Sequence, residues 1–413
     1  PACLSDPGTC ISDYSGFTDA EAAQLETLRQ LTNVAEDAVV AYTITNDEID
    51  GTDDITDLAA GDIVLSWSFT TQSIGNVLST LWANTVAGSI TSADTGLTTT
   101  DVEPTLPGYA NIHTGTLALP YYLSAADSNC DAIETLSSCP PLHEYWKNAE
   151  NTFLNPLNNE PVATATQTVP LLMTQPNATS GSAIPAGGWP VVIFQHGITQ
   201  DRSNLLAIAD TLATAGFAAV AIDLPLHGIT DTTSPLYVAN GERPFDLDLL
   251  DNPTKAAGAD TLIDESGAHF LNLSNLLVGR DNLRQGIVDL MTLQASLVNI
   301  ATVDSNNVFF VGHSLGAMSG IPFLSFEAAV QDAVLAMPGG AIPRLLDGSV
   351  SYGPEMEAAL ASAGVIKGSS GYESFLSAAQ TVLDSADPLN YAASVGNNRG
   401  LLLFEVVGGN SSP

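Results

Sequence analysis

The stretch VFFVGHSLGAMSG, Val308 to Gly320, places a serine between two glycines directly after a run of apolar residues. A strand that turns sharply through G-x-S-x-G into a helix presents the serine side chain at the end of the strand. The residues two positions away must be small in so tight a turn, which explains Gly312 and Gly316. We therefore predict that Ser314 is a nucleophile, supported by His313 in the same turn; an ordinary strand-to-helix turn that happens to hold a serine is the alternative.

The stretch FQHGITQDRSN, Phe194 to Asn204, follows another apolar run and contains a His-Gly pair. In hydrolases with this serine turn, a loop after an earlier strand supplies one half of the oxyanion hole. Gly197 lets the backbone turn inward, so that the amide of Ile198 points at the substrate oxygen. The second amide is that of Leu315, the residue after the nucleophile. We expect His196 to support this loop rather than to act as a base, because it precedes the nucleophile.

A serine nucleophile needs a histidine to take its proton and an acid to orient that histidine. In α/β-hydrolases both follow the serine along the chain, the acid first. No histidine follows Ser314, and the acids before or inside the last predicted strand, Leu401 to Val407, are poorly placed. The six histidines are His113, His143, His196, His227, His269 and His313, and the three acids are Asp384, Asp387 and Glu405. We therefore expect a hydrolase domain that lacks its C-terminal end, with the acid and the histidine on a segment absent from this sequence, such as another fragment of the same precursor.

Strands and helices alternate from about residue 107 onward. The strands WPVVIFQ (189–195) and FAAVAIDLP (217–225) are continuously apolar, as parallel strands buried on both faces are. We predict an α/β-hydrolase fold over residues 107–413, a mostly parallel sheet with helices on both faces. Residues 1–106 are assigned to an N-terminal accessory region, and the irregular residues from 226 to 275 to a cap over the site.

The stretch IDLPLHG, Ile222 to Gly228, resembles the turn after the next strand in many α/β-hydrolases. We expect Asp223 and His227 to organise this turn rather than to react. His269, later in the cap, is expected to have a packing or gating role.

Ten lysines and arginines face 46 aspartates and glutamates, for a formal net charge of −36. So acidic a chain repels nucleic acids and anionic membranes, which argues against a polyanion-binding role. We predict the disulfides Cys3–Cys10 and Cys130–Cys139, because each pair is close in sequence and neither gap fits the usual spacing of zinc ligands. No apolar run is long enough for a transmembrane segment. These features indicate a mature exported protein.

The acidic stretch NDEIDGTDDITD, residues 46–57, partly matches a calcium-binding loop, with a glycine at the sixth place. It lacks the leading aspartate and the final glutamate of such a loop, so a solvated acidic loop is the favoured interpretation. We predict no metal site and no organic cofactor, because a serine hydrolase needs neither.

Four stretches in order, PVVIFQHGITQDRSN, AVAIDLPLHG, SGAHFLNLSNLLVGRDNLRQ and VGHSLGAMSG, resemble the bacterial virulence-factor lipase family. DIVLSWSFTTQSI and GTLALPYYL also resemble its N-terminal part, so the resemblance covers most of the chain. It implies an α/β-hydrolase fold and an extracellular or surface-anchored enzyme that hydrolyses esters of lipid or lysophospholipid, with Ser314 as nucleophile. It also implies a further C-terminal stretch that carries the acid and the histidine.

We therefore predict a serine carboxylester hydrolase, a lipase, esterase or lysophospholipase, secreted or held at the surface of a bacterium. Its partner is a lipid or ester substrate. The alternative is an inactive α/β-hydrolase fold that serves as a binding or surface-assembly protein.

Overall fold

The computed structural model describes residues 72–131, 138–396 and 399–406. The predicted Cys3–Cys10 disulfide, the 46–57 loop and most of the accessory region 1–106 lie outside these residues. Described residues from Ser73 onward belong to one compact unit. Its first elements, helix α2 (Asn76–Ala83) and strand β1 (Ile90–Thr98), come from the stretch that the sequence pattern assigned to the accessory region. These two elements belong to the same compact unit as the rest of the sheet.

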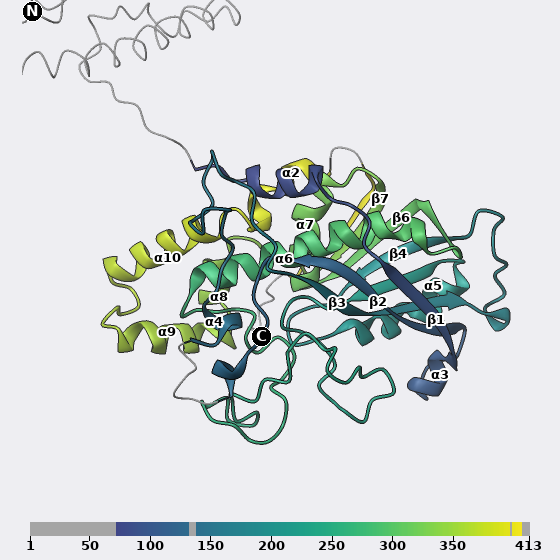
Figure 1. The fold of residues 1–413 in the computed structure, drawn as a ribbon, viewed down its shortest axis with the longest axis horizontal. Coiled ribbons are helices and arrows are strands. Elements are labelled where there is room, and N and C mark those ends of the chain that lie inside the picture. Colours follow the sequence, from purple (N-terminus) through teal and green to yellow (C-terminus); the bar gives the residue numbers. More distant parts are fainter. Residues whose placement is uncertain (1–71, 132–137, 397–398, 407–413) are drawn as a thin grey trace, which may run out of the picture. The chain divides into compact units, whose positions relative to one another are not determined.

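One sheet of eight strands runs through the described residues, in the order β1-β2-β3-β5-β4-β6-β7-β8 (Figure 1). The pairs β1-β2, β2-β3 and β3-β5 are antiparallel. The pairs β5-β4, β4-β6, β6-β7 and β7-β8 are parallel. This confirms the predicted α/β-hydrolase fold with its mostly parallel sheet. The other strands are β2 (Ala110–Tyr121), β3 (Ala165–Pro176), β4 (Trp189–Gln195), β5 (Ala218–Ile222), β6 (Val303–His313), β7 (Val330–Ala336) and β8 (Leu401–Phe404).

Helices cover both faces of the sheet, as β4 shows. Val191 and Ile193 of β4 belong to the core cluster that holds residues of α6 and α7, whereas Val192 and Phe194 pack with residues of α5. Successive side chains of a strand point to opposite faces, so β4 is buried on both sides and is apolar throughout. The other helices are α3 (Thr99–Val102), α4 (Pro140–His143), α5 (Leu206–Thr214), α6 (Leu276–Ser296), α7 (Leu315–Phe326), α8 (Ile342–Asp347), α9 (Tyr352–Ser362), α10 (Ser370–Leu383) and α11 (Ala392–Val395).

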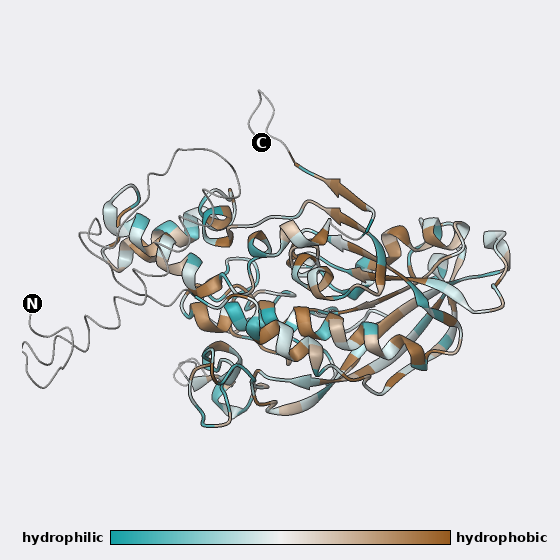
Figure 2. Cartoon of the chain, turned by 90° about the horizontal axis from the view of Figure 1, so that it is seen from above, coloured by the Kyte–Doolittle hydropathy of each residue, from teal (hydrophilic) through white to brown (hydrophobic). Residues whose placement is uncertain are grey.

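Strand β8 ends at Phe404, so the prediction that it extends to Val407 was wrong. Its partner β7 ends at Ala336, which pairs with Phe404, and a strand with one neighbour cannot continue its ladder further. Glu405 therefore follows the strand and does not lie inside it. Figure 2 shows β8 as a hydrophobic strand at the margin of the sheet, next to the C-terminus.

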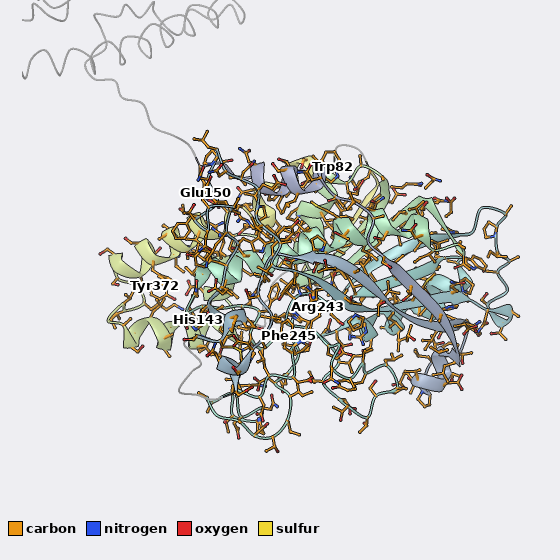
Figure 3. The ribbon with its side chains drawn as sticks, in the orientation of Figure 1. Trp82, His143, Glu150, Arg243, Phe245 and Tyr372 are labelled. Carbon is orange, nitrogen blue, oxygen red and sulfur yellow. A yellow bond between two sulfur atoms is a disulfide. The ribbon has the colours of Figure 1, made fainter. Side chains whose placement is uncertain are left out.

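The cap region, 226–275, contains turns and isolated bridges but neither helix nor strand. Its contacts with the rest of the unit include an ion pair and a hydrophobic cluster. Arg243, labelled in Figure 3, pairs with Asp289 of α6 at 2.8 Å. The predicted Cys130–Cys139 disulfide is present, and its buried residues pack against Leu247 and Leu249 of the cap.

Candidate active site

The candidate site lies where β4 and β6 are neighbours. From β4 the chain continues to β5 on one side and later to β6 on the other, and ligands in α/β sheets usually bind outside the carboxyl ends of strands at such a point. The loop after β4 and the turn after β6 are in contact there. A Cβ added to Gly197 would lie 3.1 Å from Cβ of Ser314.

Ser314 is the single residue between β6 and α7, which is the context that a G-x-S-x-G turn requires. Its φ of 51° and ψ of −115° are unusual for a non-glycine residue, and such strain costs about 1–3 kcal/mol. Its amide donates to the carbonyl of Ala336 at 2.7 Å. Its hydroxyl forms no hydrogen bond with any residue that the structure describes, so it remains available for chemistry.

The two glycines of the turn face backbone at very short distances. A Cβ on Gly316 would lie 2.1 Å from the carbonyl oxygen of Gln195, and a Cβ on Gly312 would lie 2.7 Å from the amide nitrogen of Ala317. Real Cβ atoms essentially never approach other heavy atoms closer than 3.0 Å. Neither position therefore accepts a side chain, which is the steric reason that the sequence pattern suggested.

Ile198, Ser314 and Leu315 line one cavity of about 310 Å³. Neither the amide of Ile198 nor that of Leu315 donates a hydrogen bond to another residue in the described ranges. Leu315 opens α7, so its N–H also lies at the positive end of the helix. Two unpaired amides next to a serine are the arrangement that stabilises an oxyanion.

His196 is fully buried and both of its ring nitrogens are engaged. Nδ1 donates to the carbonyl of Gly197 at 2.8 Å, and Nε2 accepts from the amide of Leu224 at 3.1 Å. Burial lowers the pKa of His196 from 6.5 to about 4, so the ring stays neutral near pH 7. The ring holds the loop after β4 against the start of the next loop, as a supporting residue does.

His313 and Gln200 form a contact that the sequence analysis missed. Nδ1 of His313 lies 3.0 Å from Oε1 of Gln200, which also accepts from the amide of Gly197 at 3.2 Å. Gln200 stands in the quoted loop stretch, but glutamine is an ordinary loop residue and carries no motif. Only the fold brings it beside the residue that precedes the nucleophile.

His227 and His269 form hydrogen bonds away from Ser314. His227 is buried, and Nδ1 donates to the carbonyl of Pro225 at 2.9 Å. His269 pairs through Nε2 with the buried Asp264 at 2.7 Å. Within residues 72–131, 138–396 and 399–406, no histidine hydrogen-bonds to the hydroxyl of Ser314. The described residues therefore do not identify the histidine that would take the proton of Ser314.

Asp223 organises the neighbouring loops, as the sequence predicted. Its carboxylate accepts from the amide of Arg202 at 2.6 Å and pairs with the guanidinium of the same residue. The guanidinium also pairs with Glu242 of the cap at 2.7 Å. This buried network fixes the end of the loop after β4 against the cap.

The acids considered after Ser314 have structural partners or lie at the margin of the sheet. Asp387 is fully buried and accepts from the amides of Ala341 at 3.0 Å and Ile342 at 2.8 Å, where α8 begins. Asp384 accepts from Gln380 at 2.9 Å. These contacts agree with the expectation that neither acid is placed to orient a catalytic histidine.

Half of the residues that line the cavity beside Ser314 come from α8, α9 and the turn between them. The cap region 226–275 contributes Leu271, whereas α8, α9 and the turn between them contribute most of the outer wall. Tyr372 of α10, labelled in Figure 3, donates to Asp347 of α8 at 2.7 Å and holds this wall in place. The lining residues are Ile198, Leu271, Leu283, Ser314, Leu315, Met318, Ile342, Leu345, Leu346, Gly348, Ser349 and Tyr352. Residues of the range 342–352 therefore border the cavity together with Leu271 of the cap region.

Neither a metal centre nor a membrane span is present in the part of the chain that the structure describes. No three of its histidine, cysteine, aspartate and glutamate residues gather closely enough to hold a metal ion. None of its helices has both the length and the apolar character that crossing a bilayer requires.

No protein-family model matches the chain, and no curated protein matches its sequence. Among solved structures it is similar to the acetyl xylan esterase from Paenibacillus sp. R4, at 13% identity over 83% of this chain and 92% of that chain, with a TM-score of 0.43. It is also similar to acetyl xylan esterase 1 from Thermoanaerobacterium sp. JW/SL YS485, at 13% identity over 81% of this chain and 79% of that chain, with a TM-score of 0.42. The glucuronoyl esterase from Solibacter usitatus is 13% identical over 79% of this chain and 70% of that chain, with a TM-score of 0.35. Likenesses at this level assign no function. Membership of the virulence-factor lipase family stays a prediction.

Proposed function

We propose that this chain is a serine carboxylester hydrolase with Ser314 as its nucleophile. The proposal is carried by the meeting of three features: a strained serine on a strand-to-helix turn, two amides without acceptors, and an apolar cavity that the serine and both amides line. A turn with a purely structural role needs none of these together.

In the proposed reaction, the hydroxyl oxygen of Ser314 attacks the ester carbonyl carbon while its proton passes to a histidine base. The carbonyl oxygen becomes an oxyanion that accepts from the amides of Ile198 and Leu315. Collapse breaks the ester C–O bond, and the base returns the proton to the leaving alcohol. Water then attacks the acyl-enzyme in the same way and releases the carboxylic acid. Each oxyanion donor contributes roughly 10²–10³ to kcat in such enzymes.

The acyl group of the substrate is aliphatic in this proposal. The cavity lining contains no charged side chain, and Met318, Ile342 and Leu346 provide apolar surface next to Ser314. Burial of methylene groups contributes about 0.8 kcal/mol each, so longer acyl chains gain affinity. This supports the lipase or lysophospholipase activity that the family resemblance implies.

The acid and the histidine come, we propose, from a further segment of the same precursor, and β8 offers it a place. The four apolar residues of β8 are between 41% and 52% exposed, and no described strand pairs with its outer edge. Proteins normally pair or cover such an edge. An apolar groove of about 410 Å³ beside it includes Phe309 and Val334. Met337, in the loop that leads to α8, donates to the carbonyl of Phe404 at 2.8 Å, so β8 ends close to this loop.

We also propose that the protein acts outside the cell or at its surface. The Cys130–Cys139 disulfide supports this, because disulfides persist mainly in oxidising compartments. The net charge of −36 keeps such a protein dispersed and opposes binding to anionic membranes.

A binding or surface-assembly protein is the second candidate, favoured by the absence of a base beside Ser314 in the described residues. A fluorophosphonate probe separates the two candidates. We expect labelling of the natural protein and of the control Ser325→Ala, whose hydroxyl bonds only to the carbonyl of Pro322 on the same helix, but not of Ser314→Ala. Folded natural protein that resists the probe would favour the binding protein.

The mass of the purified, denatured and reduced protein locates the base. A second fragment, or a chain heavier than 42.8 kDa, indicates that a further segment accompanies the chain. A single labelled species of 42.8 kDa contradicts the proposed segment, because Ser314 is then activated by residues within the chain.

A further inference from the structure

We propose that Gln200 is a positioning residue of the oxyanion hole. Its side chain sets the distance between the loop that carries the Ile198 amide and the turn that carries Ser314 and the Leu315 amide. The inference rests on the proposed function and adds a residue to it.

One atom makes the connection. Oε1 of Gln200 accepts from the amide of Gly197 at 3.2 Å and faces Nδ1 of His313 at 3.0 Å. The Gly197 amide can only donate, so the Gln200 atom that faces it is the carbonyl oxygen, and Nδ1 of His313 must then carry a proton to donate to it. The two donors stand directly before Ile198 and Ser314 in the chain. The bridge therefore joins the two halves of the oxyanion hole.

The loop that Gln200 holds is strained. Thr199 has a φ of 63°, and a β-branched residue rarely adopts a positive φ. Such a conformation persists only where the surroundings enforce it. The amide of Gln200 donates back to the carbonyl of Gly197 at 3.3 Å, which closes the turn around Thr199.

Gln200 is itself anchored from the cap. Its backbone carbonyl accepts from the hydroxyl of Ser266 at 2.6 Å, and that hydroxyl accepts from the amide of Gly228 at 3.1 Å. The residue is thus fixed on one side by the cap and on the other by His313. Because Gln200 is held at its backbone and at its side chain, it fixes the position of the Gly197 amide and of the loop around it.

The surroundings of Gly197 are tightly packed around this contact. A Cβ on Gly197 would lie 3.0 Å from Nδ1 of His313 and 3.2 Å from Oε1 of Gln200, so a side chain at residue 197 would press on both partners. Loss of the glutamine acceptor leaves two donors unpaired and frees the strained loop to relax. Misplacement of a reacting group by about 1 Å can cost roughly 10² in rate.

The test uses the full purified protein and the rate of fluorophosphonate inactivation, split into kinact and KI. Gln200→Met keeps the length of the side chain but removes the acceptor. We expect kinact to fall about tenfold or more, with KI unchanged. Gln331→Ala, which removes an exposed glutamine bonded to the carbonyl of Asn306 at 3.1 Å, serves as a matched control and should behave like the natural protein.

His313→Phe removes the other partner and should lower kinact to a similar extent. Since both variants break one bridge, the double variant should be little slower than either single variant, whereas independent effects would multiply. His313→Phe also carries the test if Gln200→Met fails to fold.

The outcomes separate the two proposals. A natural protein that the probe does not label overturns the proposed function, and the inference with it. A labelled natural protein whose Gln200→Met and His313→Phe variants react within twofold of its rate overturns the inference alone.

Discussion

The turn around Ser314 and the segment between β7 and β8 both line the same cavity but are held in different ways. At the turn, backbone touches backbone, and a Cβ on Gly316 would lie 2.1 Å from the carbonyl of Gln195. In the segment between β7 and β8, α8 is held by side chains, such as the carboxylate of Asp387 and the hydroxyl of Tyr372. The turn is thus held by packing of the main chain, whereas α8 is held by hydrogen bonds from side chains.

Gly316→Val is the most severe test of the turn around Ser314, where backbone packs against backbone. The added atoms would overlap with the carbonyls of Gln195 and His196, and neither strand β4 nor the turn can retreat without breaking the sheet. An overpacked site typically costs about 1–3 kcal/mol, and we expect this one to exceed that range and leave no folded protein. Circular dichroism and the yield of purified protein measure the outcome. Gly371→Ala, whose nearest neighbour would be Ser369 at 3.7 Å, is the tolerant control.

Acid should lower the stability of the folded protein through protonation of His196. Its pKa is lowered by burial to about 4 in the folded protein, below the 6.5 of the unfolded chain. Between these values the unfolded chain binds more protons, so stability is full above pH 6.5 and falls as the pH drops toward 4, by about 3 kcal/mol. Urea unfolding from about pH 7 to about pH 4 measures it.

Carboxylates also discharge in this range, which relieves self-repulsion and acts in the opposite direction. The difference between the natural protein and His196→Asn isolates the histidine. We expect the natural protein to lose more stability than the variant over the same range. Equal losses would show that His196 is protonated equally in both states.

Asp387→Asn tests the segment with α8, which side chains hold in place. The carboxylate accepts from the amides of Ala341, Ile342 and Leu389, and hydrogen bonds to a charged group contribute about 1.5–3 kcal/mol. We expect a loss of about 2 kcal/mol, concentrated in α8 and α9. Hydrogen exchange should rise there and stay unchanged at the turn around Ser314. A uniform rise in exchange over the whole unit would contradict the conclusion that α8 and the turn around Ser314 are held independently.

The same contrast explains what the sequence could predict. Gly312, Ser314 and Gly316 satisfy steric demands within a few residues, so their local pattern is sufficient to indicate the turn. The role of Gln200 depends on a contact with His313, 113 positions away, and no local pattern encodes it. The helices α8 and α9 were missed as part of the cavity lining for the same reason, since only the fold brings Ile342 and Tyr352 near Ser314.

Leu402→Lys has the smallest expected effect and tests whether β8 is uncovered. Leu402 is 52% exposed and lines the apolar groove, so an uncovered strand should accept a lysine at a cost within about 0.5 kcal/mol, as exposed positions generally do. Leu335→Ala, at a position of β7 that is 1% exposed, should cost about 2–5 kcal/mol and shows that the assay detects a covered site. A loss of more than about 1 kcal/mol for Leu402→Lys would exceed what a surface position allows. It would mean that another chain or segment already covers β8 in the purified protein, and fragments found by mass in that sample would identify it.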